Sequence, residues 1–195
     1  MSARLDRALA ALAQGQIIVL TGDKLRDGDI DFAISARHAD AAAINFMATH
    51  GRGLICLALT PAQALRLGIG LINPGAARQS GRPHGRAIEA REGVSTGISA
   101  ADRAQTIAVA MAPGASADDL VSPGHVFPLI AAPGGIAERP AALEAAIELT
   151  RRAGAGDAAV ICSIMRDDGE MARIDDIAEL IAQHGLAVVD LSELA

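Results

Sequence analysis

The chain has no tryptophan or tyrosine and only three phenylalanines among its 195 residues. Proteins that bind nucleic acids stack bases on aromatic side chains and follow the phosphate backbone with basic ones. Basic residues are also in deficit here, because 17 Lys and Arg face 23 Asp and Glu, for a formal net charge of -6. We therefore expect no nucleic-acid partner.

Long uncharged apolar runs are absent as well. No window approaches the roughly 20 apolar residues that a membrane-spanning helix needs. The first seven residues mix charges of both signs and lead into an amphipathic segment, unlike a secretion signal. We expect a cytoplasmic protein that has no membrane partner.

Cysteine is scarce, since Cys56 and Cys162 are the only two. Each lies inside an apolar run, and neither has the Cys or His spacing of a zinc site. In a cytoplasmic chain such residues are usually small core side chains, with a redox or metal role as the alternative.

Hydrophobic residues, mainly Ala, Ile, Leu and Val, make up 51% of the chain and suffice for one core. Their spacing alternates between helical and strand periods, which predicts an α/β fold with helices packed on a mixed β-sheet, in a single domain over 1–195. Residues 68–85 hold mostly Gly, Pro, Asn, Arg and small side chains and predict a long surface loop, either a lid or part of an interface. The expected helices are 3–14, 39–49, 61–67, 99–111, 140–153 and 173–184, and the expected strands are 17–20, 53–59, 125–131, 158–164 and 186–190.

The strongest chemical signal is the polar segment 93–103. It places Ser95 and Thr96 just before a helix whose N-cap we expect to be Ser99. The first amides of a helix point outward unpaired, so this arrangement suits an anion. A capped helix after a tight turn, with no ligand, explains the same residues, and both interpretations stay open.

Several segments together resemble one enzyme family, the 3,4-dihydroxy-2-butanone 4-phosphate synthases. The matching segments occur in family order and are 44–47, 50–57, 93–107, 123–129, 133–135 and 167–173. The resemblance implies an α/β homodimer with active sites near the subunit interface. It also implies the use of Mg²⁺ to convert ribulose 5-phosphate to 3,4-dihydroxy-2-butanone 4-phosphate and formate.

Three positions depart from the family's pattern. In the acidic loop 23–29, the family's metal-binding Glu is replaced by Leu25. The family's second metal ligand, a His, is replaced by Ala142, and its acid-base Glu on a late strand is replaced by Ser163. Because hydrocarbon side chains offer Mg²⁺ no ligand, we expect no metal cofactor.

The remaining positions supply the candidate site. His125 and Asp29 are the candidate catalytic residues, His125 because it matches a residue that the family needs and because imidazole exchanges protons near neutral pH. A structural histidine held in rigid backbone between prolines is the alternative. The candidate substrate-binding residues are Lys24, Asp27, Cys56, His84, Thr96, Asp102, Arg103, Arg139 and Glu144. Arg78, Arg82 and His84 stand where the family has its substrate loop, so they are either solvated loop charges or a new anion-binding surface.

Three functions are compatible with these residues. The first is an altered, metal-independent reaction on a sugar phosphate or another small anion, using His125 with Asp29 or Asp27. The second is a catalytically inactive homodimer that binds a ligand or partner. The third is the ordinary synthase of riboflavin biosynthesis. Our expectation from the replaced residues is the first of these.

Overall fold

The computed structural model describes residues 2–72, 74 and 82–194. Its strands form one seven-stranded mixed sheet in the order β4-β5-β3-β6-β2-β1-β7. The strands are β1 (Ile18–Asp23), β2 (Asp29–Ser35), β3 (Cys56–Leu59), β4 (Ile88–Ala90), β5 (Leu120–Ile130), β6 (Ala159–Ser163) and β7 (Ala187–Asp190). The helices are α1 (Ala3–Ala13), α2 (Ala41–Gly51), α3 (Pro61–Arg66), α4 (Ala100–Met111), α5 (Ala142–Arg152) and α6 (Ala178–His184).

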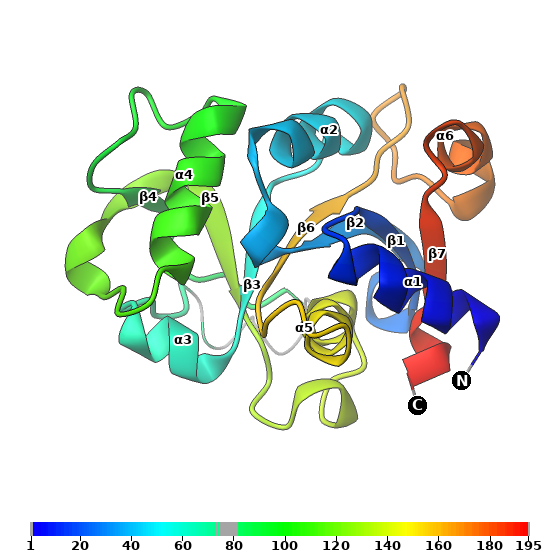
Figure 1. Ribbon diagram of the computed structural model, residues 1–195, viewed down its shortest axis with the longest axis horizontal. Coiled ribbons are helices and arrows are strands. Elements are labelled where there is room, and N and C mark those ends of the chain that lie inside the picture. The colour runs from blue at the N-terminus through cyan, green and yellow to red at the C-terminus, as the bar shows by residue number, and fades with distance from the viewer. Residues whose placement is uncertain (1, 73, 75–81, 195) are drawn as a thin grey trace.

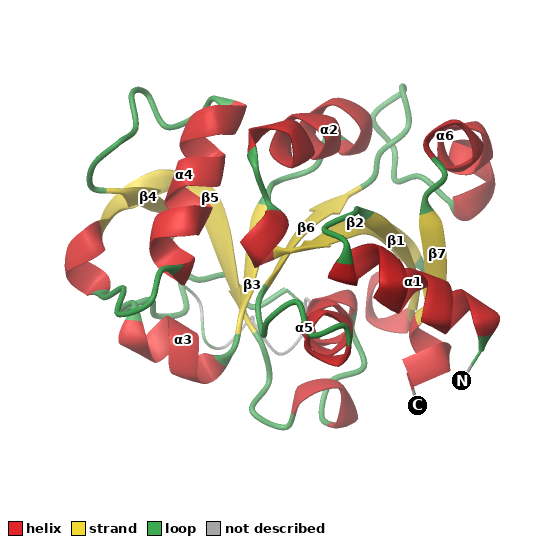
Figure 2. Cartoon of the chain, viewed as in Figure 1, coloured by secondary structure: helices red, strands yellow, loops and turns green. Residues whose placement is uncertain are grey.

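Helices cover both faces of this sheet, which gives three layers (Figures 1 and 2). Strand β2 shows how the sequence directs this arrangement, because alternate residues of a strand point to opposite faces. Ile30, Phe32 and Ile34 enter the apolar cluster that also contains buried residues of α2 and α4. Ala33, between them, enters a second cluster with α1 and α5. The predicted fold class, helices packed on a mixed β-sheet, is confirmed.

Local signals fix where several helices begin. The Thr60 hydroxyl accepts a hydrogen bond from the Gln63 amide, and the Gln63 side chain accepts one from the Thr60 amide, which forms a capping box before Pro61. Ser99 caps α4 through the Asp102 amide at 3.0 Å, as the sequence predicts. Among the described residues, no helix is long and apolar enough to cross a membrane.

Two strands were missed by the sequence prediction. Strand β2 lies in the middle of the sheet, and its alternation of Ile30, Phe32 and Ile34 with smaller or polar residues is a period-two signal that could have revealed it. Strand β4 has only three residues, too few for a periodic signal. The expected loop 68–85 is partly wrong, because Leu71 pairs with Gly85 and His84 pairs with Leu129. The candidate Arg78 lies outside the described residues.

Candidate functional site

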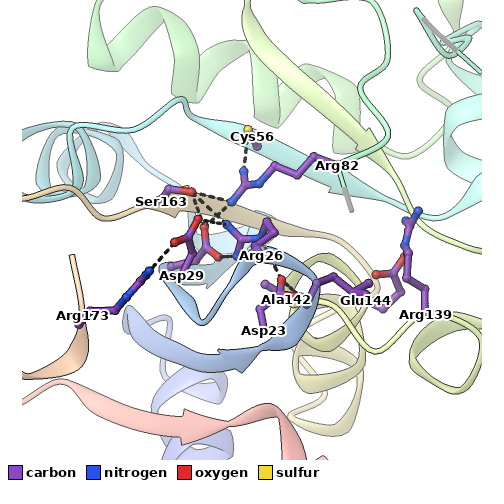
Figure 3. Close-up of polar contacts among 12 residues, drawn as sticks. Asp23, Arg26, Asp29, Cys56, Arg82, Arg139, Ala142, Glu144, Ser163 and Arg173 are labelled. Atoms are coloured by element: carbon purple, nitrogen blue, oxygen red, sulfur yellow. Dashed lines mark hydrogen bonds and ion pairs between the residues drawn. The ribbon is translucent and has the colours of Figure 1, made fainter. Parts of the chain in front are cut away.

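A group of charged side chains lies on the sheet face that carries α5, where β2 and β6 run side by side. We call it the arginine–aspartate network; its members are Asp23, Arg26, Asp29, Asp31, Arg82 and Ser163. Figure 3 shows the guanidinium groups of Arg26 and Arg82 arriving beside Ser163 from two different parts of the chain. The network therefore combines the acidic loop after β1, strand β2, the end of β6 and the segment before β4.

Asp31 is the centre of this network, and its side chain is 0% exposed. One of its carboxylate oxygens accepts hydrogen bonds from Arg82 Nη2 at 2.6 Å and from the Ser163 hydroxyl at 2.9 Å. The other accepts a bond from Arg26 Nη2. A buried carboxylate without such partners would cost several kcal/mol, so the two guanidinium groups are what allow Asp31 to lie there.

Asp23 connects the network to the beginning of α5. Its Oδ2 accepts hydrogen bonds from Arg26 Nε at 2.9 Å and from the Ala142 amide at 2.9 Å. Ala141, the N-cap residue of α5, makes no capping bond with its own side chain. A carboxylate from the distant β1 end therefore satisfies the first amide of α5 and favours its positive end.

Asp29, the candidate catalytic carboxylate, lies at the rim of the network. It accepts a hydrogen bond from Arg173 Nη1 at 2.8 Å, and Arg26 Nη1 lies 3.9 Å from its other oxygen. Lys24 and Asp27, from the same acidic loop, are exposed to solvent. The loop thus carries one half-buried carboxylate, Asp29, and one exposed carboxylate, Asp27.

Arg139 and Glu144 form an ion pair with each other, beside the first turn of α5. Glu144 Oε1 accepts hydrogen bonds from Arg139 Nε at 2.8 Å and from the Ala132 amide at 2.9 Å. Burial raises the pKa of Glu144, while the Arg139 contact opposes this rise. Glu144 is 2% exposed, so the candidate that remains accessible to a substrate is Arg139.

His125 lies on β5 and is paired with Glu89 of β4. The distance between its Nδ1 and Glu89 Oε2 is 2.8 Å, and the histidine side chain is 42% exposed. A carboxylate only accepts hydrogen bonds, so this contact favours the tautomer with the proton on Nδ1 and leaves Nε2 with a free lone pair. The sequence prediction missed Glu89, whose partner becomes apparent only when β4 and β5 are paired.

The turn before α4 is organised by Asp102. Its carboxylate accepts hydrogen bonds from the Ser95 amide at 3.2 Å, the Ser95 hydroxyl at 2.9 Å and the Gly97 amide at 3.0 Å. These bonds lower the pKa of Asp102. Asp102 therefore shapes the turn, and Thr96 and Arg103 are the residues left to contact a ligand. Thr96 is exposed, and the buried Nε of Arg103 has no hydrogen-bond partner among the described residues.

We had expected His125 and Asp29 to act together, but the structure does not bring them together within one chain. Strands β3 and β6 lie between β5 and β2 in the sheet. With neighbouring strands about 4.8 Å apart, β5 and β2 are separated by roughly 14 Å. His125 is paired with Glu89 and Asp29 with Arg173, so these two candidates belong to separate groups within one chain.

Cys56 and His84 lie near Arg82, on the inner side of the site. Arg82 Nη1 is 3.9 Å from the Cys56 sulfur, and burial raises the pKa of this thiol to about 11. Burial, with the charge of Arg82, lowers the pKa of His84, which favours its neutral form. Both side chains can shape the site, and burial favours the uncharged form of each.

The two positions at which the resemblance implies protein ligands for Mg²⁺ do not fit that role. Leu25 is 49% exposed and has no lone pair to offer, and Ala142 is a buried methyl group. Within the described part of the chain, no group of three or more His, Cys, Asp or Glu side chains could hold a metal ion. The acidic loop that contains Leu25 also carries three carboxylates, Asp23, Asp27 and Asp29.

Comparison with known proteins gives one consistent result. The family model of 3,4-dihydroxy-2-butanone 4-phosphate synthase matches residues 6–195. A synthase of Pseudomonas aeruginosa is 41% identical over 97% of this chain and 52% of its own length. A synthase of Ralstonia nicotianae is 41% identical over 100% of this chain and 86% of its own length. A riboflavin biosynthesis protein of Aquifex aeolicus is 42% identical over 97% of this chain, which spans only 47% of that relative.

Solved structures give the same result. A two-domain synthase from A. baumannii has a TM-score of 0.90 and 39% identity, over 98% of this chain and 56% of the solved one. A synthase described as being in complex with two magnesium ions also has a TM-score of 0.90, with 31% identity over 97% of this chain and 94% of the solved one.

These findings contradict two of our expectations. We expected an altered, metal-independent reaction, whereas relatives about 40% identical over nearly the whole chain carry the name of the ordinary synthase. We also expected no metal cofactor, whereas a closely similar structure contains magnesium. Replacement of the residues at positions 25 and 142 was therefore insufficient ground for either conclusion. The chain belongs to the 3,4-dihydroxy-2-butanone 4-phosphate synthase family.

Proposed function

We propose that the chain is a 3,4-dihydroxy-2-butanone 4-phosphate synthase of riboflavin biosynthesis, which converts ribulose 5-phosphate to that product and formate. The observation that carries the proposal is the extent of the match. Relatives with this name are 39% and 41% identical over 100% of this chain, and the chain spans 93% and 86% of their lengths. The chain spans about half the length of several other relatives, so further activities of those proteins are not part of the proposal.

In this proposal His125 is the proton-exchanging residue. The reaction moves protons next to a carbonyl, which requires a side chain that can accept a proton and return it. Glu89 holds Nδ1 at 2.8 Å, so Nε2 takes a proton from the substrate and returns it later. Glu89 itself does not meet the substrate and acts by orienting the imidazole ring.

The substrate's phosphate needs cationic or amide partners, and the chain offers two groups of them. Arg103 and Thr96 lie at the N-terminal end of α4, where the helix favours an anion. Lys24 directly follows Asp23 of the arginine–aspartate network, and Arg139 lies beside the first turn of α5, whose first amide Asp23 binds. Asp27 and Asp29 are suited to the substrate's hydroxyl groups, which donate hydrogen bonds to carboxylates.

Magnesium remains part of the proposed reaction because the family uses it. Mg²⁺ commonly keeps several waters and binds through one or two carboxylates together with substrate oxygens. Asp27 and Asp29 are the carboxylates of the acidic loop that could fill this reduced role. Bound there, the ion would hold vicinal oxygens of the sugar as negative charge develops on them.

A homodimer completes the proposal. The resemblance implies active sites near a subunit interface, and three apolar side chains close to the candidate groups are exposed in the single chain. Leu25 is 49% exposed, Leu54 is 54% exposed and Ile98 is 55% exposed. A partner that covers them could bring its His125 to the other chain's Asp29. A monomeric mass at micromolar concentration would rule out this assembly.

We also propose that residues 1–195 act as one catalytic domain in the cytoplasm. Both cysteines are free and buried, which suits a reducing compartment.

The function is tested by measuring formate released from ribulose 5-phosphate by the wild type and by His125→Ala. Loss of the proton-exchanging group should reduce turnover by at least about 100-fold. His38→Ala is the matched control, because His38 is an exposed histidine on the short helix Ala36–His38, outside both candidate groups. If His125→Ala turned over as fast as the control, the assigned role of His125 would be wrong.

A further inference from the structure

The carboxyl group that the resemblance implies at position 163 has a counterpart on the neighbouring strand. Strands β2 and β6 are antiparallel, and Asp31 is the register partner of Ser163. Directly opposed residues of an antiparallel pair lie on the same face with their Cβ atoms about 5 Å apart. The Asp31 carboxyl group therefore lies close to the position that the carboxyl group of a longer acidic side chain at position 163 would occupy.

The two residues are also joined chemically. The Ser163 hydroxyl donates to Asp31 Oδ1 at 2.9 Å, and Arg82 Nη2 donates both to that oxygen at 2.6 Å and to the Ser163 oxygen at 2.6 Å. Asp31, Ser163 and Arg82 thus form a closed triangle of hydrogen bonds. A serine alone at position 163 could not hold the guanidinium group, because charge-assisted bonds to a carboxylate are about twice as strong as neutral ones.

Exposure separates the roles within this triangle. Asp31 is 0% exposed, whereas the Arg82 side chain is 17% exposed and Ser163 is half-buried. A substrate could therefore reach Arg82 and Ser163 but not Asp31. The guanidinium group of Arg26, which also binds Asp23, donates to the other carboxylate oxygen of Asp31.

We propose that Asp31 is a positioning residue of the active site, which supplies from β2 the negative charge that the family carries at position 163. It holds the Arg82 guanidinium group and the Ser163 hydroxyl in place beside Cys56, where they face the substrate. The inference rests on the proposed synthase function. A purely structural ion pair predicts no recovery of activity when the carboxyl group is moved. The positioning role predicts that moving the carboxyl group from position 31 on β2 to position 163 on β6 restores activity.

The experiment compares formate release by the wild type, Asp31→Asn, Ser163→Glu and the double variant Asp31→Asn/Ser163→Glu. Displacement of Arg82 and Ser163 should lower kcat/KM of Asp31→Asn by about 100-fold, since misplacement by 1 Å has effects of that order. For the double variant Asp31→Asn/Ser163→Glu, kcat/KM should be at least about tenfold higher than for Asp31→Asn alone. Asp157→Asn is the control: Asp157 lies between α5 and β6, accepts a side-chain hydrogen bond from Gln63 and belongs to neither candidate group, so kcat/KM of this variant should stay within about twofold of the wild type.

Asp31→Asn leaves two buried guanidinium groups short of a partner and could fail to fold. A second pair of variants covers this case. Arg82→Gln should lose about as much kcat/KM as Asp31→Asn, and Asp31→Asn/Arg82→Gln should lose no more than either change alone, because residues that act as a unit are not additive. Melting temperatures should show coupling as well, because the two side chains are in contact, so kcat/KM is compared only among variants that remain folded.

The outcomes separate the inference from the function on which it rests. An inactive wild type would refute the synthase function and this role for Asp31 with it. An active wild type with an equally active, folded Asp31→Asn variant would refute the inference alone. So would a double variant with Ser163→Glu that is no better than Asp31→Asn, or additive losses in the cycle with Arg82→Gln.

Discussion

Asp23 caps helix α5, which has no capping side chain at its own N-cap residue, Ala141. Its side chain accepts hydrogen bonds from the Leu25 amide, from Arg26 and from the first amide of α5, 119 residues away. An N-cap contact of this kind is worth about 1 kcal/mol. Ala142, which could not be a metal ligand, is thus fixed in place through its backbone.

The two cysteines should be chemically inert in the folded protein. Burial raises the pKa of Cys56 to about 11 and that of Cys162 to about 12, and the thiolate is the reactive form. At pH 8, a disulfide reagent such as dithionitrobenzoate should therefore leave both thiols unmodified in the native protein and label both after denaturation. Fast labelling of either cysteine in the native protein would show that the site opens to solvent.

Asp102 should give the fold a defined dependence on acid. Hydrogen bonds from Ser95, first from its amide, hold the pKa of Asp102 below its ordinary value of 3.8. Its stabilising contribution is thus complete above pH 3.8 and is lost as the pH falls through the lower folded-state pKa. In urea unfolding at several pH values, Asp102→Asn should be less stable than the wild type near pH 7, and the difference should shrink only below pH 3.8. A difference that is independent of pH would contradict this assignment.

Residue types and spacing predicted the capping residues but missed the partners of charged groups. Ser99 was identified because an N-cap and its helix are adjacent in the sequence. Glu89 is 36 residues from His125, and Asp31 is 132 residues from Ser163. Such contacts depend on the register of strand pairs, so the sequence pattern around either residue does not reveal them.

At the scale of elements, the turn before α4 and the β4–β5 pair are packed closely together. Gly97 has φ of +84°, and a Cβ atom built there would lie 1.4 Å from Glu89 Oε1. The turn therefore occupies the space beside the carboxylate that orients His125. The polar segment 93–103 is thus packed against the side chain of Glu89.

Gly97→Ala should lower both stability and turnover. A non-glycine residue at this φ costs about 1–3 kcal/mol, and the added methyl group must also displace Glu89 from His125. Gly114→Ala is a matched control, because Gly114 has φ of +80° and its Cβ would meet no atom within 4 Å. The control should lose stability in urea unfolding and retain formate release. Full turnover by Gly97→Ala would contradict the role of Glu89.

Periodicity predicted the helices and several strands well, because their apolar residues face one or both sides of a buried layer. The late helix 173–184 is shorter than expected: residues Ile174–Ile177 form a 3-10 turn and only Ala178–His184 are α-helical. Strand β5 begins at Leu120, earlier than predicted, since Leu120 and Val121 pair with β4 before the Pro-Gly-His segment. Edges of elements depend on such tertiary pairing, which propensity does not contain.

At the scale of the whole molecule, the two candidate groups lie on different strands of one sheet, with β3 between them. The group of His125 and Glu89 lies near one edge of the sheet, and the arginine–aspartate network lies at β2 and β6. The resemblance, which comes from motifs distributed along the chain, predicted the fold class where composition alone could not. The departures from the family's pattern at three positions led to a wrong conclusion about the reaction, because relatives about 40% identical over nearly the whole chain carry the name of the ordinary synthase.

The central claim is that this chain performs the reaction of its family, and formate yield tests it most directly. Purified protein is incubated with ribulose 5-phosphate and Mg²⁺, and formate is measured against the sugar phosphate consumed. We predict one formate for each ribulose 5-phosphate consumed. Unchanged ribulose 5-phosphate, or its consumption without formate, would contradict the claim.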